Sequence, residues 1–471
     1  MTDPLWSEAE LTGALGAPPS APLGAPVDGV SIDTRTLGPR DLFFAIKGET
    51  GDGHDHVARA FAAGAAACVV ARERAGELAA FGPVFAVDDT LRAMERLGVA
   101  ARARARARIV AVTGSVGKTS AKEMLRAALA RAGPTHASAA SYNNHWGVPL
   151  TLARMPATAV FGAFEIGMNH AGEITPLVAM ARPHVALVTT VAPVHIEHLG
   201  SLEAIAEAKA EIFTGVEPGG TIVLNRDAPQ FALLERRARQ ARRAVRTFGA
   251  DASADARLLS FDPETSRAEA SVDGRTIAFA LGAPGLHMAQ NALGVLLAVE
   301  SLGADPRAAA AALAEFSAPK GRGARVALRG PDGPFTLIDE SYNANPASMR
   351  AALALLGATS PGAGGRRIAV LGDMLELGAE AKHLHAALAS DLAGARVDLL
   401  FCAGPLMRGL YEACPPSMRG SWAERSAGLR QSVLEAARGG DVVMVKGSNG
   451  SAMEPIVAAF RAHFSPTPAG E

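Results

Sequence analysis

The chain has 471 residues, more than one ordinary hydrophobic core organises, so roughly two to four domains are expected. Hydrophobic residues make up 49% and charged residues 20%, which is typical of a soluble globular protein. The formal net charge of −1 argues against general binding to nucleic acid or to an anionic membrane. The three cysteines form no C-x-x-C pair, and neither a signal peptide nor an apolar run of the ~20 residues that span a membrane is evident. We therefore expect a cytoplasmic protein.

Residues 1–87 are predicted to form a small α/β domain. A short helix and four strands are expected at 6–15, 30–33, 41–46, 67–70 and 85–87. The loops carry polar groups suited to a ligand, namely Ser31, Arg35, Lys47 and His54. Composition alone favours ordinary solvated loop positions for these four residues.

A connecting helix is predicted over 88–108. In its last part Arg102, Arg104, Arg106 and Arg108 alternate with alanine. Because no aromatic residues are interleaved, a solvated helix end or linker is favoured over a nucleic-acid-binding patch.

The most informative stretch follows a β-branched run at 109–112. Gly114-Ser115-Val116-Gly117-Lys118-Thr119-Ser120 leads into a helical pattern whose apolar residues recur at spacings of three and four. A strand, a glycine loop, Lys-Thr and a helix form the arrangement that binds nucleotide phosphates. The strict motif G-x-x-x-x-G-K-[ST] is not fully met, because its first position falls on Val112. The alternative is a tight strand-to-helix turn with a surface lysine.

The chemistry of a phosphate loop accounts for these residue types. Gly114 and Gly117 let backbone N–H groups turn toward an anion, and the helix N-terminus adds a partial positive charge. Lys118 can reach the β- and γ-phosphates, and the Thr119 hydroxyl can bind Mg²⁺. A P-loop domain over 88–318 is therefore predicted, with strands and helices that alternate around a mostly parallel sheet.

Three further candidates for a metal or phosphate site follow sheet strands: Glu165, His195 and Lys209. Taken singly, each also suits an ordinary polar position. His195 and His198 could suggest zinc, but no cysteines or third clustered ligand accompany them. Mg²⁺ with phosphate oxygens and a carboxylate is the natural partner of a phosphate loop. A small peripheral β subregion is expected between about 225 and 280, before two apolar helices.

Residues 319–471 are predicted to form a third, Rossmann-like α/β domain without its own Gly-Lys-Thr. Strands are expected at 335–340, 367–371, 397–401 and 441–445, with helices between them. The fold class is therefore α/β with three domains: a small N-terminal α/β domain, a central P-loop domain and a C-terminal Rossmann-like domain.

Together these motifs resemble the Mur ligase family over nearly the whole chain and in the same order. Besides the phosphate loop, the similar segments are 143–144, 147–149, 165–167, 208–213, 339–346, 371–378 and 445–448. Within the family, Tyr342-Asn343-Ala344-Asn345-Pro346 is similar to the type that adds D-alanyl-D-alanine. Relatives that add diaminopimelate or alanine usually carry Tyr-Ala-His-x-Pro there.

The resemblance implies an ATP-dependent amide ligase of cytoplasmic peptidoglycan precursor synthesis. Its substrates would be UDP-N-acetylmuramoyl-tripeptide and D-Ala-D-Ala, joined through an acyl phosphate, and its cofactors ATP and two Mg²⁺ ions. The chain would act as a monomer whose domains close on the substrates. The tripeptide's third residue, diaminopimelate or lysine, stays open.

The resemblance also implies roles for single residues in the central domain. Lys118 would hold the γ-phosphate of ATP, and Thr119 and Glu165 would bind Mg²⁺. His195 would approach a second Mg²⁺ ion. Lys209 resembles the lysine that CO₂ carbamylates, which turns a cation into a metal-binding carbamate.

The remaining implied roles are spread over all three domains. The adenine would contact Asn291, the phosphates Arg322, and the nucleoside Asp339, Tyr342 and Asn343. The UDP end would be held by Ser31, Arg35 and Lys47. Two departures from the family pattern stand out: Met288 replaces the first asparagine of His-Asn-x-x-Asn, and His198 ends a loop that is His-Leu-Glu-Gly-like in the family.

Other interpretations remain open at this point. A sister ligase would add a different amino acid or glutamate, which Tyr-Asn-Ala-Asn-Pro argues against. A P-loop regulator would bind ATP without ligating, but Glu165, His195 and Lys209 would then have no purpose. A plain kinase would leave the C-terminal domain without an evident use.

Overall fold

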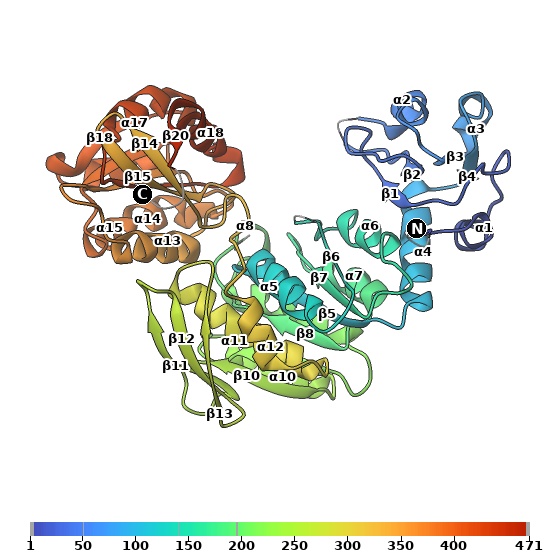
Figure 1. The fold of residues 1–471 in the computed structure, drawn as a ribbon, viewed down its shortest axis with the longest axis horizontal. Helices are drawn as coiled ribbons and strands as arrows, with labels where there is room; N and C mark the ends of the chain where they lie inside the picture. Colours follow the sequence, from blue (N-terminus) through green and yellow to red (C-terminus); the bar gives the residue numbers. More distant parts are fainter. Residues whose placement is uncertain (1–3, 50, 140, 195, 468–471) are drawn as a thin grey trace.

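Three separate β-sheets organise the chain, as seen in a computed structural model that describes residues 4–49, 51–139, 141–194 and 196–467. The sheets have four, nine and seven strands and follow one another along the sequence. Figure 1 shows the central domain between the N-terminal domain (blue) and the C-terminal domain (orange to red). The predicted α/β class with three domains is confirmed, while the residues chosen as boundaries stay predictions.

The N-terminal sheet is entirely parallel, in the order β1-β2-β3-β4. Its elements are α1 (Glu8–Leu15), β1 (Gly29–Ser31), β2 (Asp41–Phe44), α2 (Val57–Ala62), β3 (Ala67–Ala71), α3 (Ala75–Leu78) and β4 (Val84–Val87). Helix α1 begins at a capping box, in which Ser7 and Glu10 each satisfy the other's backbone N–H. The predicted helix and the four predicted strands are all present.

The connecting helix α4 (Thr90–Arg104) ties the first domain to the second. Arg102 is buried and donates to the carbonyls of Ala181 and Arg182, over 2.8 and 2.9 Å. The Arg104 guanidinium stacks on the ring of Trp6 at 3.4 Å from its centroid. The expectation that this arginine run is solvated is therefore wrong for these two residues, because neighbouring elements offer carbonyls and an aromatic face.

The central sheet has the order β13-β12-β11-β10-β9-β8-β5-β7-β6, parallel from β6 to β11. Its strands are β5 (Arg108–Thr113), β6 (Thr135–Ala137), β7 (Phe161–Glu165), β8 (Val185–Val188), β9 (Thr221–Asn225), β10 (Ala244–Gly249), β11 (Ala256–Asp262), β12 (Arg267–Val272) and β13 (Arg275–Ala280). Its helices are α5 (Lys118–Ala130), α6 (Gly147–Ala153), α7 (Ile174–Ala181), α8 (Ile196–Leu199), α9 (Leu202–Ala210), α10 (Phe231–Gln240), α11 (Leu286–Ser301) and α12 (Pro306–Ala312). Buried apolar side chains form one core on each face of the sheet, as expected for parallel strands covered on both sides.

The region between 225 and 280 does not form a separate β unit. Strand β10 pairs in parallel with β9 and β11, and β12 and β13 continue the same sheet antiparallel at its edge. The predicted peripheral β subregion is thus the edge of the central sheet, and its arginine-rich start contains α10. The aliphatic part of an arginine side chain can cover apolar surface while its charged group stays in water. An arginine-rich helix such as α10 is therefore difficult to recognise from composition alone.

The C-terminal sheet has the order β18-β17-β16-β19-β15-β14-β20. Its strands are β14 (Ala324–Gly330), β15 (Gly333–Glu340), β16 (Arg367–Gly372), β17 (Leu399–Ala403), β18 (Arg419–Ala423), β19 (Val442–Lys446) and β20 (Ser465–Pro466). Its helices are α13 (Pro346–Ala358), α14 (Ala381–Ala386), α15 (Leu388–Gly394), α16 (Met407–Ala413), α17 (Arg430–Ala436) and α18 (Glu454–His463). The four predicted strands are present, whereas β14, β18 and β20 were not predicted. In the described part of the chain, every helix is too short or too polar to cross a lipid bilayer.

Candidate active site between the central and C-terminal domains

The phosphate loop joins the end of β5 to the start of α5. Gly114 and Gly117 have φ angles of 148° and 86°, in the region that favours glycine. A Cβ atom at Gly114 would collide with the Thr189 hydroxyl, and one at Gly117 would lie 2.6 Å from Nδ2 of Asn291. Both glycines are therefore required by backbone conformation and by close packing. This supports the phosphate loop over the alternative of an ordinary strand-to-helix turn.

Lys118 points back over its own loop, and its Nζ donates to the carbonyl oxygen of Gly114 over 2.7 Å. Burial lowers the pKa of Lys118; nearby Glu165 acts to raise it and Arg322 to lower it. A lysine that is desolvated beside a glycine loop is suited to an anionic group entering the loop.

A continuous chain of hydrogen bonds crosses the floor of the site. Nη2 of Arg322 donates to Oγ of Ser141 over 3.1 Å, and Ser141 Oγ lies 3.2 Å from Oγ1 of Thr119. Thr119 Oγ1 donates to Oε2 of Glu165 over 2.8 Å, and Nδ2 of Asn143 donates to Oε1 of Glu165 over 2.7 Å. The carboxylate of Glu165 is 1% exposed, so these two donors satisfy a charge that is shielded from water.

The C-terminal domain forms the opposite wall. The Arg322 guanidinium lies over the ring of Tyr342 at 4.0 Å from its centroid. Lys446 is 2% exposed and donates to Oε2 of Glu340 over 3.2 Å and to the Asn343 carbonyl over 2.9 Å. These contacts hold the loop after β15 against β19.

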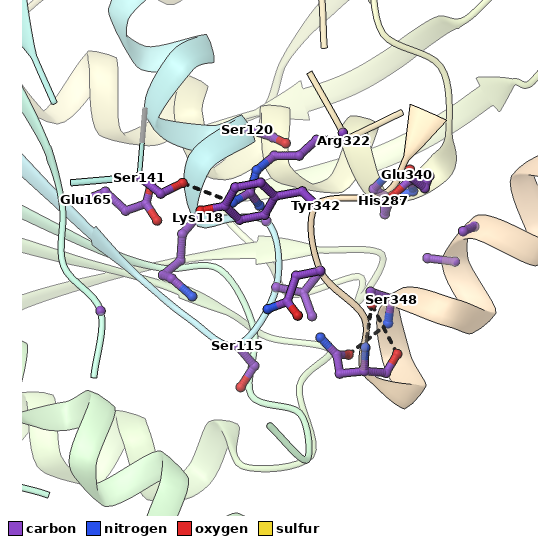
Figure 2. A pocket seen from close by; sticks show the side chains of 18 of the residues that line it. Ser115, Lys118, Ser120, Ser141, Glu165, His287, Arg322, Glu340, Tyr342 and Ser348 are labelled. Carbon is purple, nitrogen blue, oxygen red and sulfur yellow. Dashed lines mark hydrogen bonds between the residues drawn. The ribbon is translucent and has the colours of Figure 1, made fainter. Parts of the chain in front are cut away.

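The two walls enclose a cavity of about 260 Å³, shown in Figure 2. Its lining comprises Ser115, Val116, Gly117, Lys118, Ser120, Ser141, Asn143, Glu165, Gly167, Met168, Asn169, His287, Met288, Gly321, Arg322, Glu340, Tyr342, Asn343, Asn345, Ser348, Ala351, Ala352 and Lys446. We call this space the nucleotide cavity. It brings the phosphate loop, Glu165, Arg322, Tyr342 and Asn343 together, although they come from distant parts of the sequence.

Lys209, on α9, is 3% exposed. Within the described parts of the chain its ammonium group has neither a hydrogen bond nor an ion pair. Burial, and secondarily the charge of Lys118, lower the pKa of Lys209 well below its usual value. Burial therefore favours the neutral form of this amine over the charged form. His195, which was also predicted for the metal or phosphate site, falls outside the described residues.

Asn291 and Asp339 lie behind the cavity wall. Asn291 packs against Gly117, and the fully buried Asp339 accepts hydrogen bonds from the Gly321 backbone and from the backbone and hydroxyl of Ser341. Asp339 thereby fixes the turn that carries Arg322.

The three residues predicted for the UDP end lie on the N-terminal domain, away from the described lining of the nucleotide cavity. Ser31 is buried and its hydroxyl caps the turn at Asp33. Arg35 is exposed and pairs with Asp33 at 2.7 Å, which lowers the pKa of Asp33 to about 2. Lys47 is exposed and lies three residues after the end of β2.

Several lining residues were not singled out from the sequence. Lys446, Glu340 and Asn143 sit inside segments that carried the family resemblance, so that signal was present. Ser141 had no signal, because a serine in a polar loop is an ordinary occurrence and its partners lie far along the chain.

Comparison with known proteins decides the family. Three family profiles together match most of the chain between residues 26 and 449. They are the Mur ligase family catalytic domain at 26–132, the Mur ligase middle domain at 112–299, and the Mur ligase glutamate ligase domain at 321–449. UDP-N-acetylmuramoyl-tripeptide–D-alanyl-D-alanine ligase of Escherichia coli is 36% identical, over 92% of this chain and 94% of its own. The chain belongs to the Mur ligase family.

Other Mur ligases agree with this assignment. The enzyme of the same name from Bacillus subtilis is 34% identical over 92% of both chains. A crystal structure of MurF from Acinetobacter baumannii superposes with a TM-score of 0.83 at 26% identity, over 97% of this chain and 98% of that chain. A MurF ligase from Thermotoga maritima in complex with ADP has the same fold, with a TM-score of 0.73 at 23% identity over 92% and 96%.

Proposed function

We propose that this Mur ligase joins D-alanyl-D-alanine to the terminal carboxylate of UDP-N-acetylmuramoyl-tripeptide at the expense of ATP. The observation that carries the proposal is the nearly full-length similarity to ligases with this name, including 36% identity to the E. coli enzyme. The nucleotide cavity, with a phosphate loop on one wall and a second domain on the other, supports it independently.

The reaction forms an amide from a carboxylate, which needs a leaving group. In the proposed route the carboxylate attacks the γ-phosphorus of ATP, giving an acyl phosphate and ADP. The amine of D-Ala-D-Ala then attacks the acyl carbon, phosphate departs with the bonding electron pair, and the amine loses a proton. Two anions must meet in the first step, and Lys118 with the loop amides would offset their repulsion.

The residues present suit Mg²⁺ at this place. Oγ1 of Thr119 and Oε2 of Glu165, 2.8 Å apart, are hard oxygen donors of the kind that Mg²⁺ prefers. When bound, the ion would neutralise phosphate charge and polarise a phosphoryl oxygen. Asn143 would keep the Glu165 carboxylate oriented for this role.

Lys209 suits carbamylation by CO₂, because only a neutral amine reacts and burial favours that form. The product carbamate would supply two more hard oxygens beside the phosphates, and His195 is the proposed partner for a second Mg²⁺. Arg322 would bind phosphate, while Tyr342 and Asn343 line the side proposed for the nucleoside. Asn291 and Asp339, which lie behind the cavity wall, are proposed to support nucleotide binding indirectly. Asn291 would do so through Gly117, and Asp339 through the turn that carries Arg322.

The nucleotide sugar is proposed to bind the N-terminal domain through Ser31, Arg35 and Lys47. Its tripeptide must then reach the nucleotide cavity. We propose that the protein is a monomer whose three domains close on the substrates and exclude water from the acyl phosphate. Small-angle scattering would report this as a smaller radius of gyration with all ligands bound; equal radii would count against closure. The reaction is proposed to occur in the cytoplasm.

The deciding experiment measures phosphate release from ATP with both substrates and with each omitted. We expect release only when both are present, and a product heavier than the tripeptide substrate by the dipeptide less water. Release without either substrate would favour an ATPase regulator. Release with a single amino acid in place of the dipeptide would favour a sister ligase.

A further inference from the structure

Ser141 stands at the meeting point of the phosphate loop and the C-terminal domain. Its half-buried hydroxyl contacts Thr119 from the central domain and Arg322 from the segment that enters the C-terminal domain. Figure 2 shows Ser141 and Glu165 on one wall of the nucleotide cavity, with Arg322 and Tyr342 beside them. No role has been given to this serine by the proposed reaction.

The direction of each hydrogen bond in this chain follows from its end groups. A guanidinium can only donate and a carboxylate can only accept. Thr119 gives its proton to Glu165, so it must accept from Ser141, and Ser141 in turn accepts from Arg322. Each hydroxyl oxygen therefore keeps one electron pair that none of these three hydrogen bonds uses. Ser141 lines the nucleotide cavity, and Thr119 lies between the lining residues Lys118 and Ser120 in the sequence.

The spacing of these oxygens matches that of metal ligands. Mg²⁺ binds oxygen at about 2.1 Å in an octahedron, so neighbouring ligand oxygens lie about 3 Å apart. Thr119 Oγ1 is 2.8 Å from Glu165 Oε2 and 3.2 Å from Ser141 Oγ. Both distances are therefore close to the separation of two neighbouring ligand oxygens in a Mg²⁺ octahedron.

From this geometry we propose that Ser141 supplies a third protein oxygen to the Mg²⁺ site formed by Thr119 and Glu165. The inference rests on the proposed function, because it requires a magnesium–nucleotide site in this cavity. A cation bound there repels the guanidinium of Arg322, so metal loading releases Arg322 from Ser141. Arg322 is then free to move toward phosphate, which links metal occupancy to the segment that joins the two domains.

A sulfur substitution distinguishes a metal ligand from a structural hydroxyl. Thiolate ligands favour soft ions such as Cd²⁺ over Mg²⁺. In the full-length Ser141→Cys variant with ADP, we expect ultraviolet cadmium–thiolate absorbance and weaker Mg²⁺ binding. Ser348→Cys is the matched control, because Ser348 lines the same cavity but bonds Asn345 at the start of α13. It should give no such absorbance.

The second measurement is Mn²⁺ binding in the presence of ADP, monitored through the electron paramagnetic resonance signal of the Mn²⁺ that remains free. We expect Ser141→Ala to weaken Mn²⁺ binding by about tenfold, as the loss of a metal-site partner does elsewhere. Unchanged Mn²⁺ binding in Ser141→Ala, with no more cadmium absorbance in Ser141→Cys than in Ser348→Cys, would overturn the inference. If the wild type itself bound no Mn²⁺ in the presence of ADP, the proposed magnesium–nucleotide site would be contradicted as well. Normal wild-type binding with unaffected variants would overturn the role of Ser141 alone.

Discussion

The hydroxyl of Thr119 donates to Oε2 of Glu165 over 2.8 Å, although 46 residues separate the two in the chain. Thr119 is the second residue of α5, and Glu165 ends β7, which is the neighbour of β5 in the sheet. Adjacent parallel strands thus deliver a hydroxyl and a carboxylate to the same edge. That pairing underlies the proposed chemistry and the first prediction.

Glu165→Gln keeps the shape of the side chain but removes its charge. We expect substrate-dependent phosphate release to fall by about 100-fold, the scale on which loss of one electrostatic contact slows catalysis. Raising the Mg²⁺ concentration should recover part of the rate. The control is Glu207→Gln, because Glu207 forms an exposed pair with Arg237. An unaltered rate in Glu165→Gln would remove this carboxylate from the mechanism.

Lys209→Met removes the buried amine at similar volume. We expect ligation to be lost while the unfolding free energy is maintained or raised, since no ammonium then has to be buried without a partner. In the wild type, ¹³C-labelled bicarbonate should give a carbamate resonance that is absent from the variant. Full ligase activity in Lys209→Met, or the same resonance in both proteins, would contradict the proposal.

Stability should fall in mild acid because of buried neutral histidines. His385 is fully buried: its Nε2 accepts from the Met374 backbone N–H over 2.9 Å, and its Nδ1 donates to the Ala381 carbonyl over 2.6 Å. Burial, the largest cause, lowers the pKa of His385, and it also lowers the pKa of His136. The unfolded chain therefore binds these protons first, at its pKa of about 6.5. The stabilisation is full above that pH and is lost as the pH falls through the lower folded-state pKa.

The measurement is the urea unfolding free energy at several pH values between mild alkali and mild acid. Each unit of pKa difference contributes about 1.4 kcal/mol to the loss. His385→Gln should be destabilised at neutral pH and should show a shallower pH dependence than the wild type. The exposed His463 serves as the control, through His463→Gln. Parallel pH curves for wild type and His385→Gln would disprove the assignment.

Lys446→Met should destabilise the C-terminal domain. Lys446 is 2% exposed and its partner Glu340 is 12% exposed, so the variant leaves a largely buried carboxylate without its cation. Breaking such a pair costs about 3–5 kcal/mol. Adding Glu340→Gln should recover part of the loss, because the charge is then gone.

The matched control for this prediction is Lys320→Met. Lys320 pairs with Glu454 at 2.7 Å, but both side chains are about half exposed. A pair of this kind contributes about 0–1 kcal/mol. Chemical unfolding of both variants would show whether burial is what makes the Lys446 pair matter; equal losses would mean that it is not.

Local patterns in the sequence determined the phosphate loop and the sequence of elements. The run at 109–112, the two glycines, Lys118-Thr119 and the apolar spacing of α5 are neighbours along the chain, and the structure keeps them as neighbours. The alternation of buried strands and helices likewise predicted three α/β domains. Residues close in sequence determine both the apolar run of a buried strand and the three-to-four-residue spacing of a helix. The unpredicted strands β14 and β18 show where this reasoning ends. In β14 the apolar run is only three residues long (326–328) and is flanked by arginines, and β18 is half-buried along its whole length.

Only the tertiary structure decided which polar groups meet. Ser141 and Arg322 are 181 residues apart, and their contact depends on how the C-terminal domain stands over the phosphate loop. Asp339 ends a strand in a motif that suggested ligand contact, yet its full burial makes it the anchor of the turn that carries Arg322. Arg102 was expected in water and instead binds carbonyls at the end of α7. Sheet order and domain packing join residues without regard to sequence distance, and so they decide the site's hydrogen bonds, while local periodicity decides its secondary structure.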